Sequence, residues 1–525
     1  MTADIVVAGA GHNSLVTAAY LAVSGREVLV LDSRSVPGGG AATEELLGPG
    51  YLIDSCSTGH TLIQTNPLLV EDELALKQRY GLEYLVPDPF AHVAFPDGRQ
   101  LTAWMDLDRT VEEIERYSKA DGAAYRRLLA EYDEVKHIFA AGTFNPPGFG
   151  KPVEQLLREH PKGNVWLRRR MLSAWDVIRH EFEDEHVQGF LLWQAYQTLV
   201  PVESPGSGPL AYSIVFGRQR RSWTIPRGGS GRLTDALVDC IEEHGGTVLC
   251  GKRVTRLVVE GGRCAGVESE DGERFLAREA VVSTIHVKHL LDMAPAELWP
   301  DDFRYAIETF DIGVPAMGVY MAATRPPEFE TPDGPRTAVS AGLAGFPQDV
   351  LDYGRALADG RYVEDPAWIL VACPTLADPS RAPAGHHTVK LLSAQSWGFE
   401  ARKESQADRQ LERLRAVAPG FTEDAILHRL VKAPEDIERQ NEHMIGGTFH
   451  GGNRTLPQSG ALRPAPGWAQ HRMPIPGLYQ TGGTTHPGGS ITGAPGRNAA
   501  IVLLGDLGTS IEEVVDAGRA RAGSR

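Results

Sequence analysis

A glycine-rich turn between an apolar run and a helical pattern constrains the fold of this chain most strongly. The apolar run DIVVAG contains Gly9, Gly11 follows two residues later, and leucine and alanine then recur at helical spacing over residues 13–24. A second apolar run, EVLVLD, ends at Asp32. Strands that are apolar throughout are typical of a parallel sheet covered on both faces. The pattern therefore predicts a strand–helix–strand unit in an α/β fold.

The turn after the first predicted strand is suited to a pyrophosphate. Gly9 and Gly11 let the backbone approach a phosphate closely, and the helix that follows supplies free N–H groups and the positive end of its dipole. Ser14 stands where a third glycine usually packs the helix against the strand, so we interpret it as a packing variant. Asp32 is placed to accept hydrogen bonds from an adenosine ribose. The sequence predicts an adenine dinucleotide site, for NAD or FAD.

The next residues favour FAD. Gly38, Gly39 and Gly40 follow the second strand, where an NAD-binding fold usually continues directly into a helix. A glycine triplet lets the backbone run along a bulkier cofactor. Considered alone, the triplet also fits a flexible surface turn.

Composition excludes several classes of protein. The net charge of −16 leaves no basic surplus for a nucleic-acid partner. The five cysteines form no C-x-x-C pair, which argues against a disulfide framework, a zinc ribbon and a dithiol redox site. No apolar run reaches the roughly 18 residues of a membrane helix, and the first strand begins at Ile5, which leaves no room for a signal peptide. We expect a cytoplasmic protein without membrane association.

The rest of the chain alternates between helical and strand patterns. Residues 105–200 read as helices, residues 223–284 as strand, helix and a β-meander, and the run GRNAAIVLLGDL as a final helix. Residues 516–525 are predicted to be a flexible tail.

Several motifs resemble those of a known family. GAGHNSLVTAAYLA, REVLVLDSRSVPGGGAATEE, IPRGGSGRL and PIPGLYQTGGTTHPGGSITGAPGRNAA are similar to motifs of FAD-dependent oxidoreductases of the phytoene desaturase and carotenoid isomerase class, a branch of the amine-oxidase-like flavoprotein superfamily. The run PEDIERQNEHMIGGTFHGG is most similar to the non-carotenoid branch of the pyridine nucleotide-disulphide oxidoreductase domain-containing protein 2 type.

The resemblance implies a glutathione-reductase-2-like flavoprotein, in which a Rossmann-type FAD-binding domain is interleaved with an α+β substrate domain. The FAD-binding domain would comprise residues 1–60, 223–290 and 470–515. The substrate-binding domain would comprise residues 61–222 and 291–469.

The resemblance also implies which residues contact a non-covalent FAD, since no cysteine follows residue 400 to form a flavin linkage. A helix N-terminus at the pyrimidine edge would stabilise negative charge on the reduced ring. The implied contacts are Gly9, Gly11 and Ser14 at the pyrophosphate, Asp32 and Ser33 at the adenosine ribose, Gly38, Gly39, Gly40 and Ala41 along the flavin, Val254 at adenine, Gly482 and Gly483 at the pyrophosphate and ribityl chain, and Ser490 and Ile491 at the pyrimidine edge.

Catalytic side chains are harder to identify. A desaturation sends a hydride to the flavin and a proton to a base, and His60 and His486 are the candidate bases, although each also fits a structural histidine. His286 and His289 have a metal-compatible spacing, but no carboxylate pattern accompanies them and no metal is expected. The remaining basic candidates, either a solvated face or an anchor for a substrate carboxylate, are Arg218, Arg220 and Arg221.

The sequence thus predicts an FAD-dependent dehydrogenase or desaturase that moves a hydride from a C–H bond of an apolar or alicyclic small molecule to flavin. The alternatives are a flavin amine oxidase, a flavin-dependent isomerase and a non-catalytic flavoprotein that acts as a binding partner. The sequence does not identify the electron acceptor, for which oxygen and a quinone are the candidates, and the protein could form a homo-oligomer.

Overall fold

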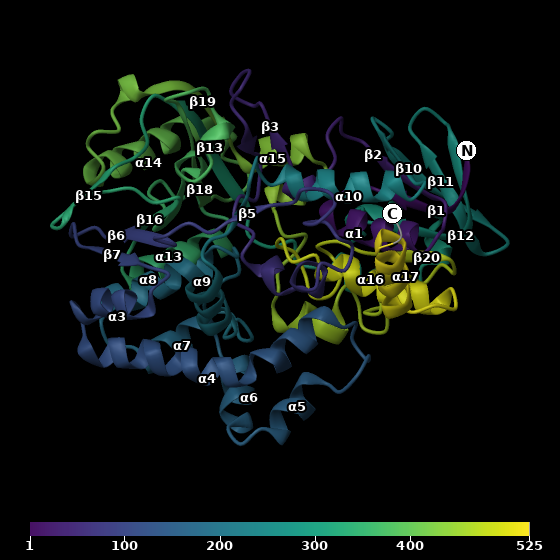
Figure 1. The fold of residues 1–525 in the computed structure, drawn as a ribbon, viewed down its shortest axis with the longest axis horizontal. Coiled ribbons are helices and arrows are strands. Elements are labelled where there is room, and N and C mark those ends of the chain that lie inside the picture. Colours follow the sequence, from purple (N-terminus) through teal and green to yellow (C-terminus); the bar gives the residue numbers. More distant parts are fainter. Residues whose placement is uncertain (524–525) are drawn as a thin grey trace.

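Two large sheets, each assembled from segments far apart in the sequence, organise the chain (Figure 1). The computed structural model describes residues 1–523. None of the helices in this range is long and apolar enough to cross a lipid bilayer.

The first sheet has seven strands in the order β10-β11-β12-β1-β2-β9, with β20 paired to β12. Its central strands are parallel, and β10, β11 and β12 form the predicted antiparallel meander. The strands are β1 (Thr2–Ala8), β2 (Val28–Asp32), β9 (Thr247–Cys250), β10 (Val254–Glu260), β11 (Arg263–Ser269), β12 (Arg274–Ser283) and β20 (Leu478–Gln480).

Helix α1 (His12–Val23) packs between α10 (Gly231–Glu243) and α16 (Ala494–Asp506) over this sheet. Nearly every side chain of α1 is buried, because the helix contacts the sheet on one side and neighbouring helices on the others. The predicted strand–helix–strand unit is therefore confirmed as β1, α1 and β2, and so is the α/β fold.

The second sheet has the order β19-β13-β18-β17-β16-β6-β7. Helix α14 (Lys403–Val417) covers one face, where Val389 and Leu391 of β18 point. Side chains alternate along a strand, so Lys390 and Leu392 of β18 point to the opposite face. The strands are β6 (Ala91–Ala94), β7 (Gln100–Ala103), β13 (Ala316–Ala323), β16 (Ser340–Ala344), β17 (Trp368–Ala372), β18 (His387–Ala394) and β19 (Ile426–Lys432).

A helical layer lies below the second sheet in Figure 1. Its helices between residues 107 and 196 confirm the helical pattern predicted for residues 105–200, and a further helix follows at residues 215–221. The core of this layer contains a cluster of aromatic side chains that includes Tyr132, Trp166 and Tyr212. The helices are α3 (Leu107–Glu115), α4 (Lys119–Phe144), α5 (Val153–Glu159), α6 (Gly163–Met171), α7 (Ala174–Glu181), α8 (Glu185–Tyr196) and α9 (Val215–Arg221).

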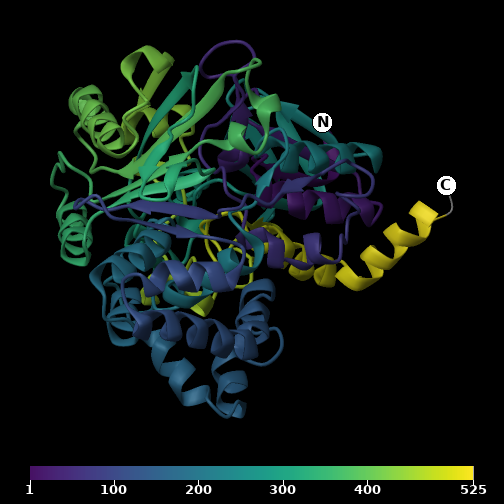
Figure 2. The same ribbon diagram turned by 60° about the vertical axis from the view of Figure 1, so that its left-hand side comes forward.

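The chain end differs from the prediction. Helix α16 is not the last helix, because α17 (Ile511–Gly523) follows it and extends from the edge of the molecule (Figure 2). Buried Ile511, Val514 and Val515 anchor the first turns of α17, and residues 516–523 continue this helix instead of forming the predicted tail. Residues 524–525 lie outside the described part of the chain.

The strands of each sheet fall within the segments assigned to one domain by the sequence. Strands of the first sheet come from residues 2–32, 247–283 and 478–480. The division of the chain at the predicted domain boundaries stays a prediction.

Candidate active site

A cavity opens where the parallel strands of the first sheet end. It encloses about 1880 Å³ of space not filled by protein atoms, part of which is open to solvent. The residues that follow β1, β2, β12 and β20 line one part of it, and β17 and β18 of the second sheet line another. Carboxyl ends of parallel strands are the usual ligand site of such sheets.

Backbone rather than side chains forms the wall beside β1. Gly9 has φ +100°, and a Cβ atom there would lie 2.4 Å from Cγ2 of Thr284. Gly482 has φ +92°, and its Cβ would lie 2.4 Å from Oγ1 of the same threonine. The turns after β1 and β20 therefore meet on Thr284 with no room for larger residues, and Gly9, Gly11, Gly482 and Gly483 all line the cavity.

Ser14 braces this turn rather than facing the cavity. Its buried hydroxyl lies 2.6 Å from the carbonyl oxygen of Gly9 and 2.9 Å from that of Gly11. No side chain caps the N-terminus of α1. The N–H of His12 donates to the carbonyl of Gly38 at 3.3 Å, and the N–H of Asn13, a residue that lines the cavity, has no such backbone partner in the described chain. The interpretation of Ser14 as a packing variant accounts for these contacts.

Asp32 ends β2 with its carboxylate at the cavity wall. Its Oδ2 accepts from the N–H of Ala10 at 2.6 Å, and its Oδ1 accepts from the N–H of Arg34 at 2.8 Å. Burial raises the pKa of Asp32, partly offset by these hydrogen bonds. Each oxygen keeps a lone pair for a ligand hydroxyl. Ser33 and Val254 line the cavity beside Asp32.

The three glycines of the triplet differ in whether they line the cavity. Gly39 and Gly40 line the cavity, whereas Gly38 (φ +117°) donates its N–H to the carbonyl of Ala10 at 2.7 Å behind them. Ala41 is buried next to the triplet and does not line the cavity. At the other end, Ser490 (φ +85°) and Ile491 line the cavity just before α16.

These features fit an adenine dinucleotide. A carboxylate stands at one end, two glycine turns and an uncapped helix N-terminus form the middle, and backbone near a second helix forms the other end. The buried Oδ1 of Asn13 and Nε2 of His286 have no hydrogen-bond partner within residues 1–523, and both residues line the cavity, so a polar ligand can satisfy them.

The two predicted bases are not at the cavity wall. His60 is buried with Nε2 2.9 Å from Oγ of Ser230 and Nδ1 3.2 Å from the Tyr84 hydroxyl, and burial lowers its pKa to about 3. His486 donates from Nε2 to the carbonyl of Gly142 at 2.9 Å, and burial lowers its pKa to about 4. Both histidines are held by protein groups, so the structure does not support either as the base.

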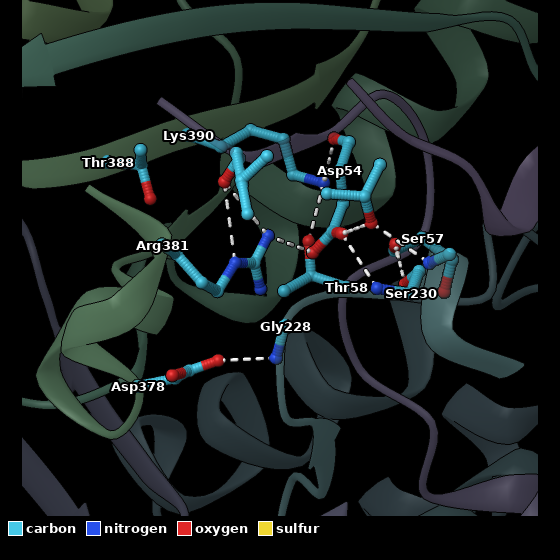
Figure 3. A network of polar contacts seen from close by, with 12 residues as sticks. Asp54, Ser57, Thr58, Gly228, Ser230, Asp378, Arg381, Thr388 and Lys390 are labelled. Carbon is cyan, nitrogen blue, oxygen red and sulfur yellow. Dashed lines mark hydrogen bonds and ion pairs between the residues drawn. The ribbon is translucent and has the colours of Figure 1, made fainter. Parts of the chain in front are cut away.

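Two other polar side chains, which the sequence did not indicate as catalytic, reach the cavity. Lys390 is buried, and its Nζ donates to the carbonyl of Cys56 at 2.6 Å and to Oγ1 of Thr58 at 2.8 Å (Figure 3). Burial lowers the pKa of Lys390 to about 8. A lysine inside the apolar strand pattern TVKLLSA was the sequence signal for this group. His450 also lines the cavity, with Nδ1 3.3 Å from Oγ of Ser490.

The wall beyond the cofactor residues combines large apolar side chains with polar ones such as Thr58, Gln197 and Thr198. The cations in this part of the wall are Arg218 and Lys390. The carboxylates that line the cavity within the described chain are Asp32 and Glu442, and both lie in other parts of the wall. Glu442 forms an ion pair with Arg253. The apolar lining residues are Leu62, Leu199, Ile214, Trp223, Leu370, Leu392, Met444 and Phe449.

Comparison with known proteins also indicates a flavoprotein. Residues 15–500 match the family described as flavin containing amine oxidoreductase. The chain is 29% identical to pyridine nucleotide-disulfide oxidoreductase domain-containing protein 2 of Mus musculus, over 96% of this chain and 94% of that protein. It is 27% identical to one of the subunits of the limonene dehydrogenase of Castellaniella defragrans, over 97% of this chain and 95% of that protein.

The fold is also similar to that of putrescine oxidase bound to putrescine. The TM-score is 0.61 at 14% identity, covering 97% of this chain and 99% of that chain. The predicted family resemblance and the predicted cofactor are therefore confirmed. The chain belongs to the flavin-containing amine oxidoreductase family and is an FAD-dependent oxidoreductase.

Proposed function

We propose that the protein is a dehydrogenase that forms a carbon–carbon double bond in an apolar or alicyclic small molecule. The observation that carries this proposal is the set of leucine, isoleucine, methionine and aromatic side chains that line the cavity next to the cofactor residues. Burying an apolar substrate there contributes about 25 cal/mol for each Å² removed from water. The similarity to part of a limonene dehydrogenase supports the same substrate class.

The cofactor residues would hold FAD by backbone contacts and one carboxylate. When bound, FAD supplies the acceptor for the hydride that leaves the substrate carbon. The turn glycines would accommodate the pyrophosphate and Asp32 would bind the ribose. The proposed contacts that line the cavity are Gly9, Gly11, Asp32, Ser33, Gly39, Gly40, Val254, Gly482, Gly483, Ser490 and Ile491, with Ser14, Gly38 and Ala41 supporting them from behind.

His450 is the proposed proton acceptor. Forming the double bond removes a hydride from one carbon and a proton from its neighbour. Burial lowers the pKa of His450 to about 3, so its imidazole is neutral at pH 7 and is a weak base. A weak base is sufficient here, because loss of the hydride makes the neighbouring C–H strongly acidic.

Amine oxidation is less compatible with the charges of the wall. An alkylamine is a cation at pH 7, and the substrate part of the cavity presents the cations of Arg218 and Lys390. Like charges in a partly desolvated cavity repel one another. The proposed substrate is therefore uncharged or anionic.

Anaerobic reduction of the FAD-loaded protein tests the proposal. A panel of cyclic alkenes, cyclic ketones, alicyclic acids and alkylamines is added, and loss of the yellow flavin absorbance is followed. We expect an alicyclic compound to bleach the flavin and to yield a product with one more double bond. Bleaching by amines with imine formation would instead establish an amine oxidase.

Two further results would contradict the proposal. Rearrangement of a substrate only after chemical reduction of the flavin would indicate an isomerase. A flavin that no compound of the panel reduces would indicate the non-catalytic alternative.

We also propose that oxygen or a quinone is the electron acceptor. Adding each of them to the bleached protein, and following the return of the yellow colour, tests this proposal.

A cytoplasmic location is supported by the free state of all five cysteines, Cys56, Cys240, Cys250, Cys264 and Cys373. Homo-oligomerisation is tested by light scattering.

A further inference from the structure

One buried guanidinium at the cavity wall has no anionic partner. Arg218 lies in the last turn of α9, is 6% exposed and lines the cavity. Its neighbours differ, since Arg220 is exposed and Arg221 is half-buried. The solvated face predicted for these three arginines therefore does not include Arg218.

The hydrogen bonds of Arg218 are incomplete. Its Nη2 donates to Oε1 of Gln197 at 2.5 Å, whereas Nε and Nη1 have no hydrogen-bond partner in residues 1–523. The Nε2 amide of Gln197 has none either. Burial lowers the pKa of Arg218 to about 9, so the group stays charged at pH 7. Donors remain on two adjacent side chains, and no protein carboxylate of the described chain pairs with them.

The other buried arginines of the described chain are held by carboxylates or backbone carbonyls, although Nη1 of Arg381 and Nε of Arg463 also lack a hydrogen-bond partner. Arg497 pairs with Glu73 at 2.7 Å, Arg169 pairs with Glu131 and Glu181, and Arg463 donates to several backbone carbonyls. Lys390, the other cation of the substrate wall, has its Nζ hydrogen-bonded to protein oxygens. Arg218 is therefore the wall cation with unused donors, and a buried charge without a partner is costly.

The backbone around the pair is strained. Leu199, two residues after Gln197, has φ +49°, and Ser222, which ends α9, has φ +64°. A π-helical turn, Leu210–Ile214, directly precedes α9. Strained residues and π-turns concentrate where a fold positions side chains for function. Leu199 and Ile214 also line the cavity, so apolar surface adjoins the donors.

We propose that Arg218 and Gln197 form a subsite for the carboxylate of an apolar substrate acid. Guanidinium donors match carboxylate oxygens in geometry and charge, and the amide of Gln197 adds a further donor. The neighbouring apolar wall would receive the hydrocarbon part of the same molecule. This inference rests on the proposed dehydrogenase function and narrows its substrate to alicyclic or aliphatic carboxylic acids.

Ligand binding to the oxidised holoprotein tests the subsite without turnover. Cyclohexanecarboxylate and its neutral analogue cyclohexylmethanol are titrated while changes in the flavin absorbance spectrum are recorded. We expect saturable binding of the acid that weakens about 100-fold in Arg218→Met and about tenfold in Arg218→Lys. Binding of the alcohol should stay the same in both variants. Arg220→Met, on the same helix but exposed, is the matched control and should bind the acid like wild type.

Gln197→Glu gives a second, independent variant. The new carboxylate would pair with Arg218 within the protein, so we expect higher thermal stability together with loss of acid binding. This variant keeps the test decisive if Arg218→Met does not fold.

The proposed subsite would be wrong if Arg218→Met and Gln197→Glu bound the acid with unchanged affinity. It would also be wrong if Arg218→Lys lost FAD, because the arginine would then bind the cofactor. The outcomes separate this inference from the proposed function. Flavin reduction by neutral hydrocarbons without acid binding refutes the subsite alone, whereas Arg218-dependent acid binding without reduction by any compound refutes the dehydrogenase alone.

Discussion

The carboxylate of Asp54 and the guanidinium of Arg381 form an ion pair in which neither side chain has any exposure to solvent. Oδ2 of Asp54 lies 2.8 Å from Nη2 of Arg381 (Figure 3). The two charges are in contact, but the contact does not have the angles of a hydrogen bond. Oδ1 of Asp54 accepts from the N–H of Ser230 at 2.9 Å. The pair thus joins the segment after the glycine triplet to the connection between β17 and β18, and the hydrogen bond from Ser230 adds the N-terminus of α10.

Breaking this pair should destabilise the protein strongly. Arg381→Met leaves the buried carboxylate of Asp54 without its closest cation, and we expect the free energy of unfolding to fall by about 3–5 kcal/mol. Urea unfolding of the holoprotein measures the change. Arg355→Met is the matched control, because Arg355 pairs with Glu203 at the surface and its loss should cost no more than about 1 kcal/mol. Equal effects of the two substitutions would contradict this prediction.

The turn after β1 should tolerate no side chain. In Gly9→Ala the new Cβ would lie 2.4 Å from Thr284, so we expect FAD affinity to fall by about tenfold or more. Gly25→Ala is the control, since Gly25 has a similar φ of +92° but nothing within 4 Å of the new Cβ. It should cost about 1 kcal/mol of stability and leave FAD binding intact. Fluorescence titration of the apoprotein with FAD distinguishes the two.

Stability should fall in mild acid, partly through His92. Burial lowers its pKa to about 4, below the ordinary value of 6.5, despite a hydrogen bond to Gln100. Below pH 6.5 the unfolded chain therefore binds a proton that the folded protein does not, and the free energy of unfolding falls by about 1.4 kcal/mol per pH unit down to the folded pKa. His92→Gln should reduce the slope of stability between pH 6 and 4.5 by this amount.

The control for this pH dependence is His137→Gln, at an exposed position of α4. Its slope should equal that of wild type. Chemical unfolding at several pH values gives both slopes, and an unchanged slope in His92→Gln would refute the assignment.

His450 and His60 should differ in their effects on the reaction. With a compound that reduces the flavin, His450→Gln should slow anaerobic reduction by about 10²–10⁴-fold, because it removes the proposed proton acceptor. His60→Gln should leave the rate unchanged in FAD-loaded protein and lower stability by about 1–3 kcal/mol, because Ser230 and Tyr84 lose a buried partner. Stopped-flow absorbance and thermal unfolding provide the two measurements. Slow flavin reduction in His60→Gln together with a normal rate in His450→Gln would instead identify His60 as the proton acceptor.

The local sequence pattern was sufficient to predict the strands, the helix and the turn next to the cofactor residues. The apolar runs, the spacing of Gly9 and Gly11 and the acid at Asp32 depend on residues close in sequence, and each has a conformational or charge requirement that few other residues meet. The same local pattern could not reveal that Ser14 bonds the carbonyls of the turn, because this depends on how tightly α1 packs on β1.

The sequence by itself determined the α/β class, the family and the FAD cofactor, because these follow from periodicity, turn glycines and motifs of short range. Only the tertiary structure decided which polar side chains reach the cavity. His60 and His486 lie near cofactor motifs in sequence but are held by protein groups, whereas Arg218, Lys390 and His450 come from three distant segments. Burial, strand alternation and the absence of a partner are properties of the packed chain, and they decide which groups remain available to a ligand.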